Sequence, residues 1–126
     1  MPAAHHHYHQ DQAFRDRSTL IRLLEHLENA VTDISGIPSP AALDDNRILF
    51  NSVAMEMTQV QECARNLSDG FRDTMPSLPW KELRALRNVI VHDYDEIDVE
   101  SLYDTVTRDA PRLVTQLRPL VDAIDD

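Results

Sequence analysis

The 126-residue sequence contains only two glycines and one cysteine, and it has no long apolar run. The scarcity of glycine and the lack of a long alternating run of β-branched residues disfavour a β-sheet. Leu, Ala, Arg, Glu and Gln, which favour helices, dominate the periodic segments instead. We therefore expect an all-α fold, and the chain length suits one domain with a single core.

The single cysteine, Cys63, excludes an internal disulfide framework and fits a reducing compartment. Its neighbours predict a position on a helix surface or facing a partner, with nothing nearby that activates the thiol. No apolar run approaches the roughly 20 residues that cross a bilayer, and the N-terminus lacks the pattern of a signal peptide. These absences predict a cytoplasmic protein that makes no use of a membrane.

The net charge of −10 argues against a broad electrostatic grip on nucleic acid, which normally requires a basic face. The charges are unevenly distributed, however. Lys81, Arg84 and Arg87 form a small basic cluster, whereas seven acidic residues lie within 93–109. This pattern predicts contact with RNA at one focused site, and the acidic surface could equally repel nucleic acid or bind a basic partner.

Apolar residues recur at spacings of three and four along most of the chain, which is typical of amphipathic helices. The spacing predicts helices over 13–34, 41–72 and 79–92, with Ser77 as the N-cap of the third. A fourth helix is expected to begin at Asp98 and to kink or restart at Pro111. Short connections between such helices predict an antiparallel bundle of four or five helices.

Residues 1–12 carry four histidines, either native or left from cloning, and are expected to form a disordered arm. Residues 13–126 are expected to form the helical domain. Metal binding by the arm would be incidental, because functional metal sites need ligands that a fold holds in place. We predict neither a metal site nor a cofactor.

The most informative segment covers residues 87–94 and reads Arg-Asn-Val-Ile-Val-His-Asp-Tyr. Arg87 can hold a phosphate in its planar fork, and His92 can take or give a proton near neutral pH. Asn88 adds an amide and Tyr94 a phenol. These groups suffice to cleave a phosphodiester without a metal ion.

Helix geometry limits how this segment could work. Residues advance by about 100° each, so Arg87 and His92 would point roughly 140° apart on an undistorted helix, whereas Asn88 and His92 would be neighbours. Either the helix loosens near His92, or a second chain supplies the missing group. A two-fold dimer would bring two copies of Arg87 and His92 around one cleft, and we favour this second solution.

A purely structural interpretation is also available. Arg87 could pair with Asp93 or Asp95, and a histidine near a helix C-terminus is favoured by the helix dipole. Tyr94 could pack its ring at the end of the bundle.

The wider pattern resembles a known family. Pro79-Trp80, the segment Leu86–Tyr94, Ile97-Asp98 and the later Asp109-Ala110-Pro111-Arg112-Leu113 are together similar to the HepT-like branch of the HEPN superfamily, over about residues 15–122. The resemblance implies an all-α homodimer that acts as a metal-independent endoribonuclease toxin. It further implies a cognate minimal nucleotidyltransferase antitoxin that neutralises the toxin by adenylylation.

Applied to this sequence, the resemblance makes Arg87 and His92 the catalytic pair, Asn88 a supporting residue and Tyr94 the adenylylation site. The chemistry is consistent, since RNA carries its own nucleophile in the 2′-hydroxyl. One His92 would accept that proton while its symmetry mate protonates the leaving 5′-oxygen, and Arg87 would stabilise the phosphorane. The product would carry a 2′,3′-cyclic phosphate.

Two other functions fit the same residues. In the first, the protein is a non-catalytic helical partner that binds substrate for a nucleotidyltransferase, and the acidic charge favours this slightly. In the second, the bundle has only a structural role. The intact Arg87–His92 pair favours the ribonuclease.

Overall fold

A computed structural model describes residues 9–90 and 97–125. Every regular element in these residues is helical, which confirms the predicted all-α class. The elements are, in order, α1 Gln10–Ile34, α2 Pro40–Asp44, α3 Arg47–Asn66, α4 Asp69–Thr74, α5 Trp80–Ala85, the 3-10 helix η2 Leu86–Asn88, α6 Val99–Asp104, the π-helical turn η4 Thr105–Asp109, and α7 Ala110–Asp125.

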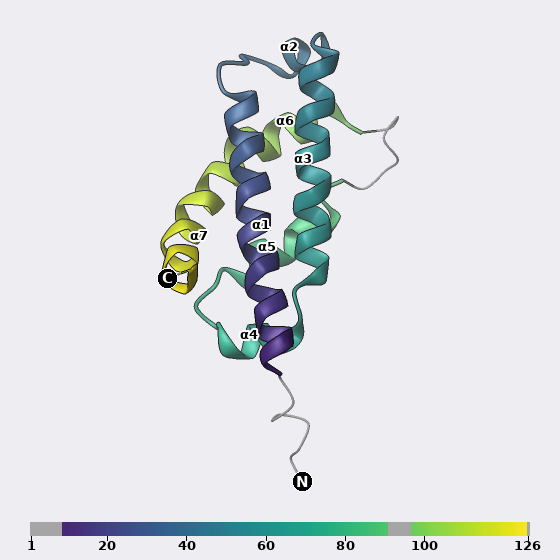
Figure 1. The fold of residues 1–126 in the computed structure, drawn as a ribbon. Coiled ribbons are helices and arrows are strands. Elements are labelled where there is room, and N and C mark those ends of the chain that lie inside the picture. The colour runs from purple at the N-terminus through teal and green to yellow at the C-terminus, as the bar shows by residue number, and fades with distance from the viewer. Residues whose placement is uncertain (1–8, 91–96, 126) are drawn as a thin grey trace.

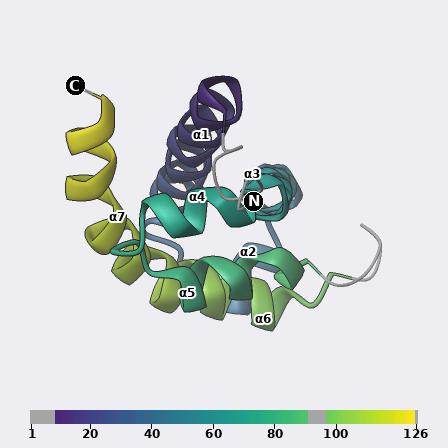
Figure 2. The same ribbon diagram turned by 90° about the horizontal axis from the view of Figure 1, so that it is seen from below.

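The two long helices α1 and α3 lie side by side and run in opposite directions (Figure 1). Helix α7 packs along α1, and α5 and α6 lie on the side of the bundle away from α1 (Figure 2). Helix α1 begins at Gln10, three residues before its predicted start at 13. Most of the predicted disordered arm, residues 1–8, lies outside the described residues.

The prediction of one helix over 41–72 is wrong, because the structure divides this segment into α2, α3 and α4. Two polar side chains start new helices inside it. Asn46 accepts a hydrogen bond from the Leu49 amide at 3.1 Å, and Ser68 accepts one from the Phe71 amide at 3.2 Å. Such N-caps satisfy amides that the first helical turn leaves unpaired, so each one marks a break that apolar spacing does not reveal.

The last helical segment runs without interruption from α6 through η4 into α7. Asp98 caps α6 as predicted, since its side chain accepts a hydrogen bond from the Glu100 amide at 3.0 Å. The π-helical turn lies directly before Ala110 and Pro111. Proline lacks an amide hydrogen and its ring crowds the preceding turn, so a widened turn accommodates Pro111 without ending the helix.

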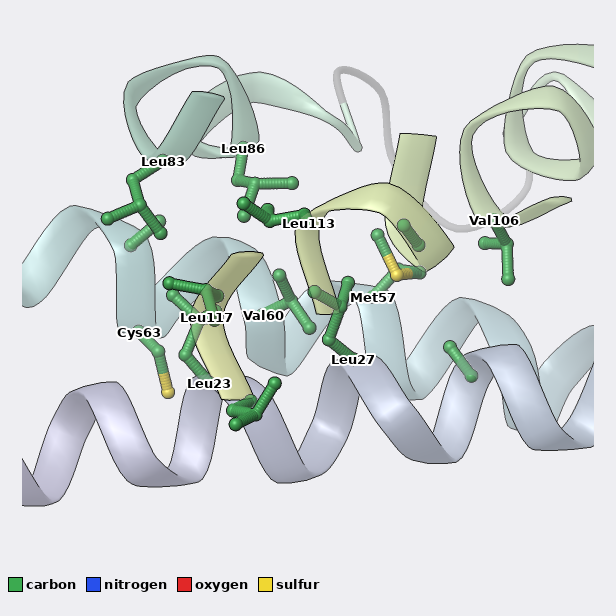
Figure 3. Close-up of a cluster of buried hydrophobic side chains, with 14 of the residues drawn as sticks. Leu23, Leu27, Met57, Val60, Cys63, Leu83, Leu86, Val106, Leu113 and Leu117 are labelled. Atoms are coloured by element: carbon green, nitrogen blue, oxygen red, sulfur yellow. The ribbon is translucent and has the colours of Figure 1, made fainter. Parts of the chain in front are cut away.

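The core shown in Figure 3 includes side chains of α1, α3, α5 and α7. Leu27 of α1, Val60 of α3 and Leu117 of α7 are fully buried, and Leu83 of α5 is nearly so. Each fully buried side chain of this kind contributes roughly 1.5–3 kcal/mol relative to its exposed state. The start of α5 is therefore fixed to the rest of the bundle by its apolar face.

A buried carboxylate joins α1 to the start of α4. Asp16 is fully buried, and its two oxygens accept hydrogen bonds from the Ser68 amide at 2.9 Å and the Ser68 hydroxyl at 2.6 Å. Ser68 is also the N-cap of α4. The Asp16 carboxylate therefore holds this N-cap in place and links the start of α4 to α1. The sequence pattern did not indicate a role for Asp16, which looks like an ordinary surface residue in the first turns of an amphipathic helix.

Candidate functional site

The start of α5 is held by Trp80. The indole Nε1 donates a hydrogen bond to the Met75 carbonyl at 2.8 Å, and the Trp80 and Phe71 rings form a T-shaped pair with centroids 5.9 Å apart and planes at 84°. The predicted N-cap Ser77 is wrong, since Pro79 occupies the N-cap position without a side-chain hydrogen bond. Packing by the Pro79-Trp80 pair replaces a polar cap at this helix.

The α-helix ends at Ala85, earlier than the predicted 92. Residues 86–88 form a 3-10 turn, and residues 89 and 90 form a bend in which the Val89 backbone keeps αR angles (φ −67°, ψ −32°). The Val89 amide contacts the Leu86 carbonyl only at 3.4 Å. The sequence supplies a reason, since Val89 begins a run of three β-branched residues that disfavour the α-helix. We call residues 86–90 the motif segment.

Two of the four predicted site residues lie in the motif segment. Arg87 is half-buried and Asn88 is exposed, while the neighbouring Leu86 points into the core. The other two, His92 and Tyr94, lie outside the described residues, as do Asp93 and Asp95, the suggested partners of Arg87. The angle of 140° expected between Arg87 and His92 assumed an α-helix, and that assumption fails already at residue 86.

The Arg87 side chain contains an unusual feature. Its Nε atom is buried and, within the described residues, has no hydrogen-bond acceptor. Buried donors are nearly always paired, because an unsatisfied one costs about 1–3 kcal/mol. A guanidinium held in this state can bind an acceptor that residues 9–90 and 97–125 do not provide.

Two side chains of α3 bind the backbone of the motif segment. Arg65 Nε donates to the Arg87 carbonyl at 2.9 Å, and Gln61 Oε1 accepts the Ile90 amide at 2.6 Å. Gln61 is only 6% exposed. Neither residue was predicted from the sequence. A glutamine inside the buried stripe that contains Val60 and Ala64 is the one signal that points to Gln61.

The charge around Arg87 is locally positive. Lys81 and Arg84 are exposed on α5 and form no ion pair with the described residues, whereas Arg65 makes a long contact of 3.4 Å with Glu62. Exposed pairs of that kind are weak. The basic cluster predicted from the sequence therefore lies on and beside the motif segment.

A cavity of about 540 Å³ lies against α5 and the motif segment, and neither Arg87 nor Asn88 lines it. Glu82, Ala85 and Val89 line one wall, and Asp109 and Arg112 contribute to the other. With two acidic groups and one basic group it offers no clear preference for an anion, so the cavity does not extend the basic site.

The expected surface position of Cys63 is wrong. The side chain is 7% exposed and points from α3 toward α1 (Figure 3). Burial raises the pKa of its thiol, against a smaller opposing effect of Arg22. The thiolate is the reactive form, so this cysteine is unsuited to act as a nucleophile.

No group of three or more potential metal ligands occurs within residues 9–90 and 97–125. None of the helices in this part of the chain is long and apolar enough to cross a membrane.

Comparison with known proteins identifies the family. Residues 23–120 match the family model described as "Ribonuclease HepT-like". "Putative RNase MJ1380" of Methanocaldococcus jannaschii is 32% identical over 69 residues, which are 55% of this chain and 63% of that protein. "Probable ribonuclease HepT" of Thermococcus cleftensis is 33% identical over 71 residues, or 56% of this chain and 64% of that protein.

A third relative covers more of the chain at lower identity. "Putative RNase TTE0752" of Caldanaerobacter subterraneus subsp. tengcongensis is 23% identical over 105 residues, which are 83% of this chain and 93% of that protein. The alignments to the first two relatives span less than two thirds of their lengths. No solved structure gives a significant match. Because the family model spans most of the sequence, including α5 and the motif segment, the chain belongs to the HepT-like ribonuclease family.

Proposed function

We propose that this protein is a metal-independent endoribonuclease, the toxin of a toxin–antitoxin pair, that acts in the cytoplasm on RNA. Family membership supports the class of reaction, and the relatives' names refer to ribonucleases. The observation that carries the proposal is the buried Arg87 Nε, which has no acceptor in the part of the chain that the structure describes, on a turn that α3 holds in place. A phosphate oxygen of RNA is the kind of acceptor that this donor lacks.

The reaction follows from the proposed roles. His92 removes the proton from the 2′-hydroxyl, and the resulting oxygen attacks the adjacent phosphorus. Arg87 stabilises the negative charge that develops on the phosphorane, where a positioned cation has its largest effect. The bond to the 5′-oxygen breaks and that oxygen receives a proton, which leaves a 2′,3′-cyclic phosphate and a 5′-hydroxyl. No metal-activated water is required, because RNA supplies the nucleophile.

The proposal includes a homodimer, in which the second His92 supplies the proton for the leaving oxygen. Asn88, exposed beside Arg87, supports the site by hydrogen bonding to the RNA. A cognate minimal nucleotidyltransferase acts as the antitoxin and attaches an adenylyl group to Tyr94. The added phosphate would bring negative charge to the cleft and repel RNA.

Cleavage of a labelled RNA in excess EDTA tests the ribonuclease. Wild type should produce fragments that end in cyclic phosphate, whereas His92→Ala should produce none while retaining its helical spectrum and melting temperature. Undiminished cleavage by His92→Ala would contradict the assignment of His92. No cleavage by unmodified, dimeric wild type would favour the non-catalytic partner of a nucleotidyltransferase.

Adenylylation needs a separate test. The protein is co-expressed with a candidate cognate nucleotidyltransferase and measured by intact mass, with Tyr94→Phe as the matched control. The expected result is a mass increase equal to one or more AMP groups in wild type alone. The same increase in Tyr94→Phe would place the modification elsewhere.

A further inference from the structure

The end of α5 leaves backbone groups that need hydrogen-bond partners from other elements. When an α-helix stops, its last carbonyls lose their intrahelical partners, and the residues that follow lose partners for their amides. Here the Arg87 carbonyl and the Ile90 amide are such groups, at the two ends of the turn that carries Asn88 and Val89. Both are bound by side chains of α3.

Gln61 is a costly residue for its position. It lies in the buried stripe of α3 and is 6% exposed, where a leucine would contribute apolar burial without a polar group to satisfy. Its Oε1 accepts the Ile90 amide at 2.6 Å, the shortest of the hydrogen bonds around the motif segment. The benefit of the glutamine is therefore local, since it fixes the backbone directly before the segment that leads to His92.

Arg65 lies one turn further along α3, so both side chains project from the same face toward η2. Its Nε donates to the Arg87 carbonyl at 2.9 Å, which leaves the rest of the guanidinium partly exposed beside Arg87. Arg65 thus holds the Arg87 carbonyl, and Gln61 holds the Ile90 amide three residues later.

We propose that Gln61 and Arg65 are positioning residues that fix the direction of Arg87 and the start of the segment carrying His92. This inference rests on the proposed ribonuclease function. The two hydrogen bonds make the turn part of the rigid α3 scaffold, where a free turn would shift by more than the reaction tolerates. Displacement of a reacting group by about 1 Å can lower a rate by roughly 100-fold.

The first test compares Gln61→Leu with Gln61→Glu in the full chain. The leucine variant removes the acceptor, and we expect kcat to fall about tenfold with KM changed less than about twofold, because the freed backbone no longer holds Arg87 in its reactive position. The glutamate variant keeps an acceptor oxygen and should restore most of kcat. The control is Gln59→Leu, the same change at an exposed position on α3, which should behave as wild type.

A purely structural role would lower the melting temperature of Gln61→Leu without changing kcat well below that temperature. Unchanged kcat in Gln61→Leu, or an equal loss in Gln59→Leu, would overturn the proposal. If Gln61→Leu does not fold, Arg65→Ala decides, because Arg65 is exposed. We expect a loss in kcat relative to Arg47→Ala, which removes the same charge from the start of α3. A change in KM alone would show that Arg65 only binds substrate.

Amide hydrogen exchange separates failure of this inference from failure of the proposed function. Exchange at Ile90 should be slow in wild type and in Gln61→Glu, and faster in Gln61→Leu, whether or not the protein cleaves RNA. An inactive wild type would contradict the ribonuclease and, with it, any catalytic role of Gln61. An active wild type with equal Ile90 exchange and equal kcat in all variants would contradict the positioning role alone.

Discussion

Helix α3 and the motif segment both come from sequence with helical spacing, but only one becomes an α-helix throughout. Helix α3 continues for 20 residues, with its buried face against α1. Helix α5 stops after six residues and passes through a 3-10 turn into a bend. The difference shows that tertiary packing stabilises the first, whereas the motif segment depends on hydrogen bonds from the first to hold its backbone.

The largest effect should come from a change that affects only the motif segment. Arg87→Ala should lower the rate of RNA cleavage by about 10³-fold, close to 4 kcal/mol in the barrier, because it removes the cation beside the phosphorane. Its melting temperature should stay near that of wild type, since the side chain contributes little to the core. Initial rates and thermal unfolding measure the two quantities, with Arg87→Lys expected to retain part of the rate. Full activity in Arg87→Ala would contradict a catalytic role for the motif segment.

The converse change affects only the scaffold. Leu27→Ala leaves a cavity between α1 and its neighbours and should lower the free energy of unfolding by about 3 kcal/mol. Cleavage measured well below the unfolding temperature should remain close to wild type. Urea titration measures the loss, and Glu25→Ala at an exposed site of α1 provides the control. If Leu27→Ala lost activity while folded, stability and catalysis would not be separable in these two regions.

A buried polar contact of the scaffold should have a somewhat smaller effect. Asp16→Ala removes the acceptor of the Ser68 amide and hydroxyl and should cost about 2 kcal/mol of unfolding free energy. Asp11→Ala, in the exposed first turn of α1, should cost much less. Equal losses for the two variants would mean that the Asp16–Ser68 contact adds nothing specific.

The anchor of α5 tests the connection between the two regions. Trp80→Phe keeps an aromatic ring but removes the donor to the Met75 carbonyl, and should lower the free energy of unfolding by about 1 kcal/mol. Urea unfolding monitored by circular dichroism measures this loss. A neutral result would indicate that ring packing alone holds the start of α5.

The smallest effect concerns pH at the start of α6. The Ser101 hydroxyl and then the Glu100 amide bond the Asp98 carboxylate and hold its pKa below the usual value near 4. The ionised cap is therefore fully effective above about pH 4 and is lost as the pH falls through the lowered pKa. In wild type, the protection of the Glu100 amide against hydrogen exchange should fall over that pH range. In Asp98→Asn, which has no carboxylate to protonate, this protection should not change with pH. A titration of Asp98 at or above the usual value would contradict the cap.

The buried faces of the long helices could be predicted from the sequence, because apolar residues recur along it at helical spacing. Leu20, Leu24 and Leu27 recur at helical spacing, and all are buried in α1. The same rule merged α2, α3 and α4, since Leu67 and Phe71 continue the apolar stripe across the break that Ser68 creates. Local hydrogen bonds by Asn46 and Ser68 override the spacing there, and both are polar residues that favour helix starts.

The site was predictable only in part for a related reason. Arg87 and Asn88 were found because their chemistry is evident within a short segment. Gln61, Arg65 and Asp16 act through contacts 22 to 52 residues away in the chain, which no spacing rule contains. A polar residue inside a buried stripe is the available clue, and it identifies Gln61 but not its partner.

Burial of Cys63 has a practical consequence for testing the dimer. A protonated, enclosed thiol reacts slowly with maleimides and methanethiosulfonates, so the one native cysteine need not be removed before labelling. Ile48 is 79% exposed on α3, so the substitution Ile48→Cys would introduce the single accessible thiol of the chain. One spin label per chain at that position would report an intermolecular distance in a homodimer and none in a monomer.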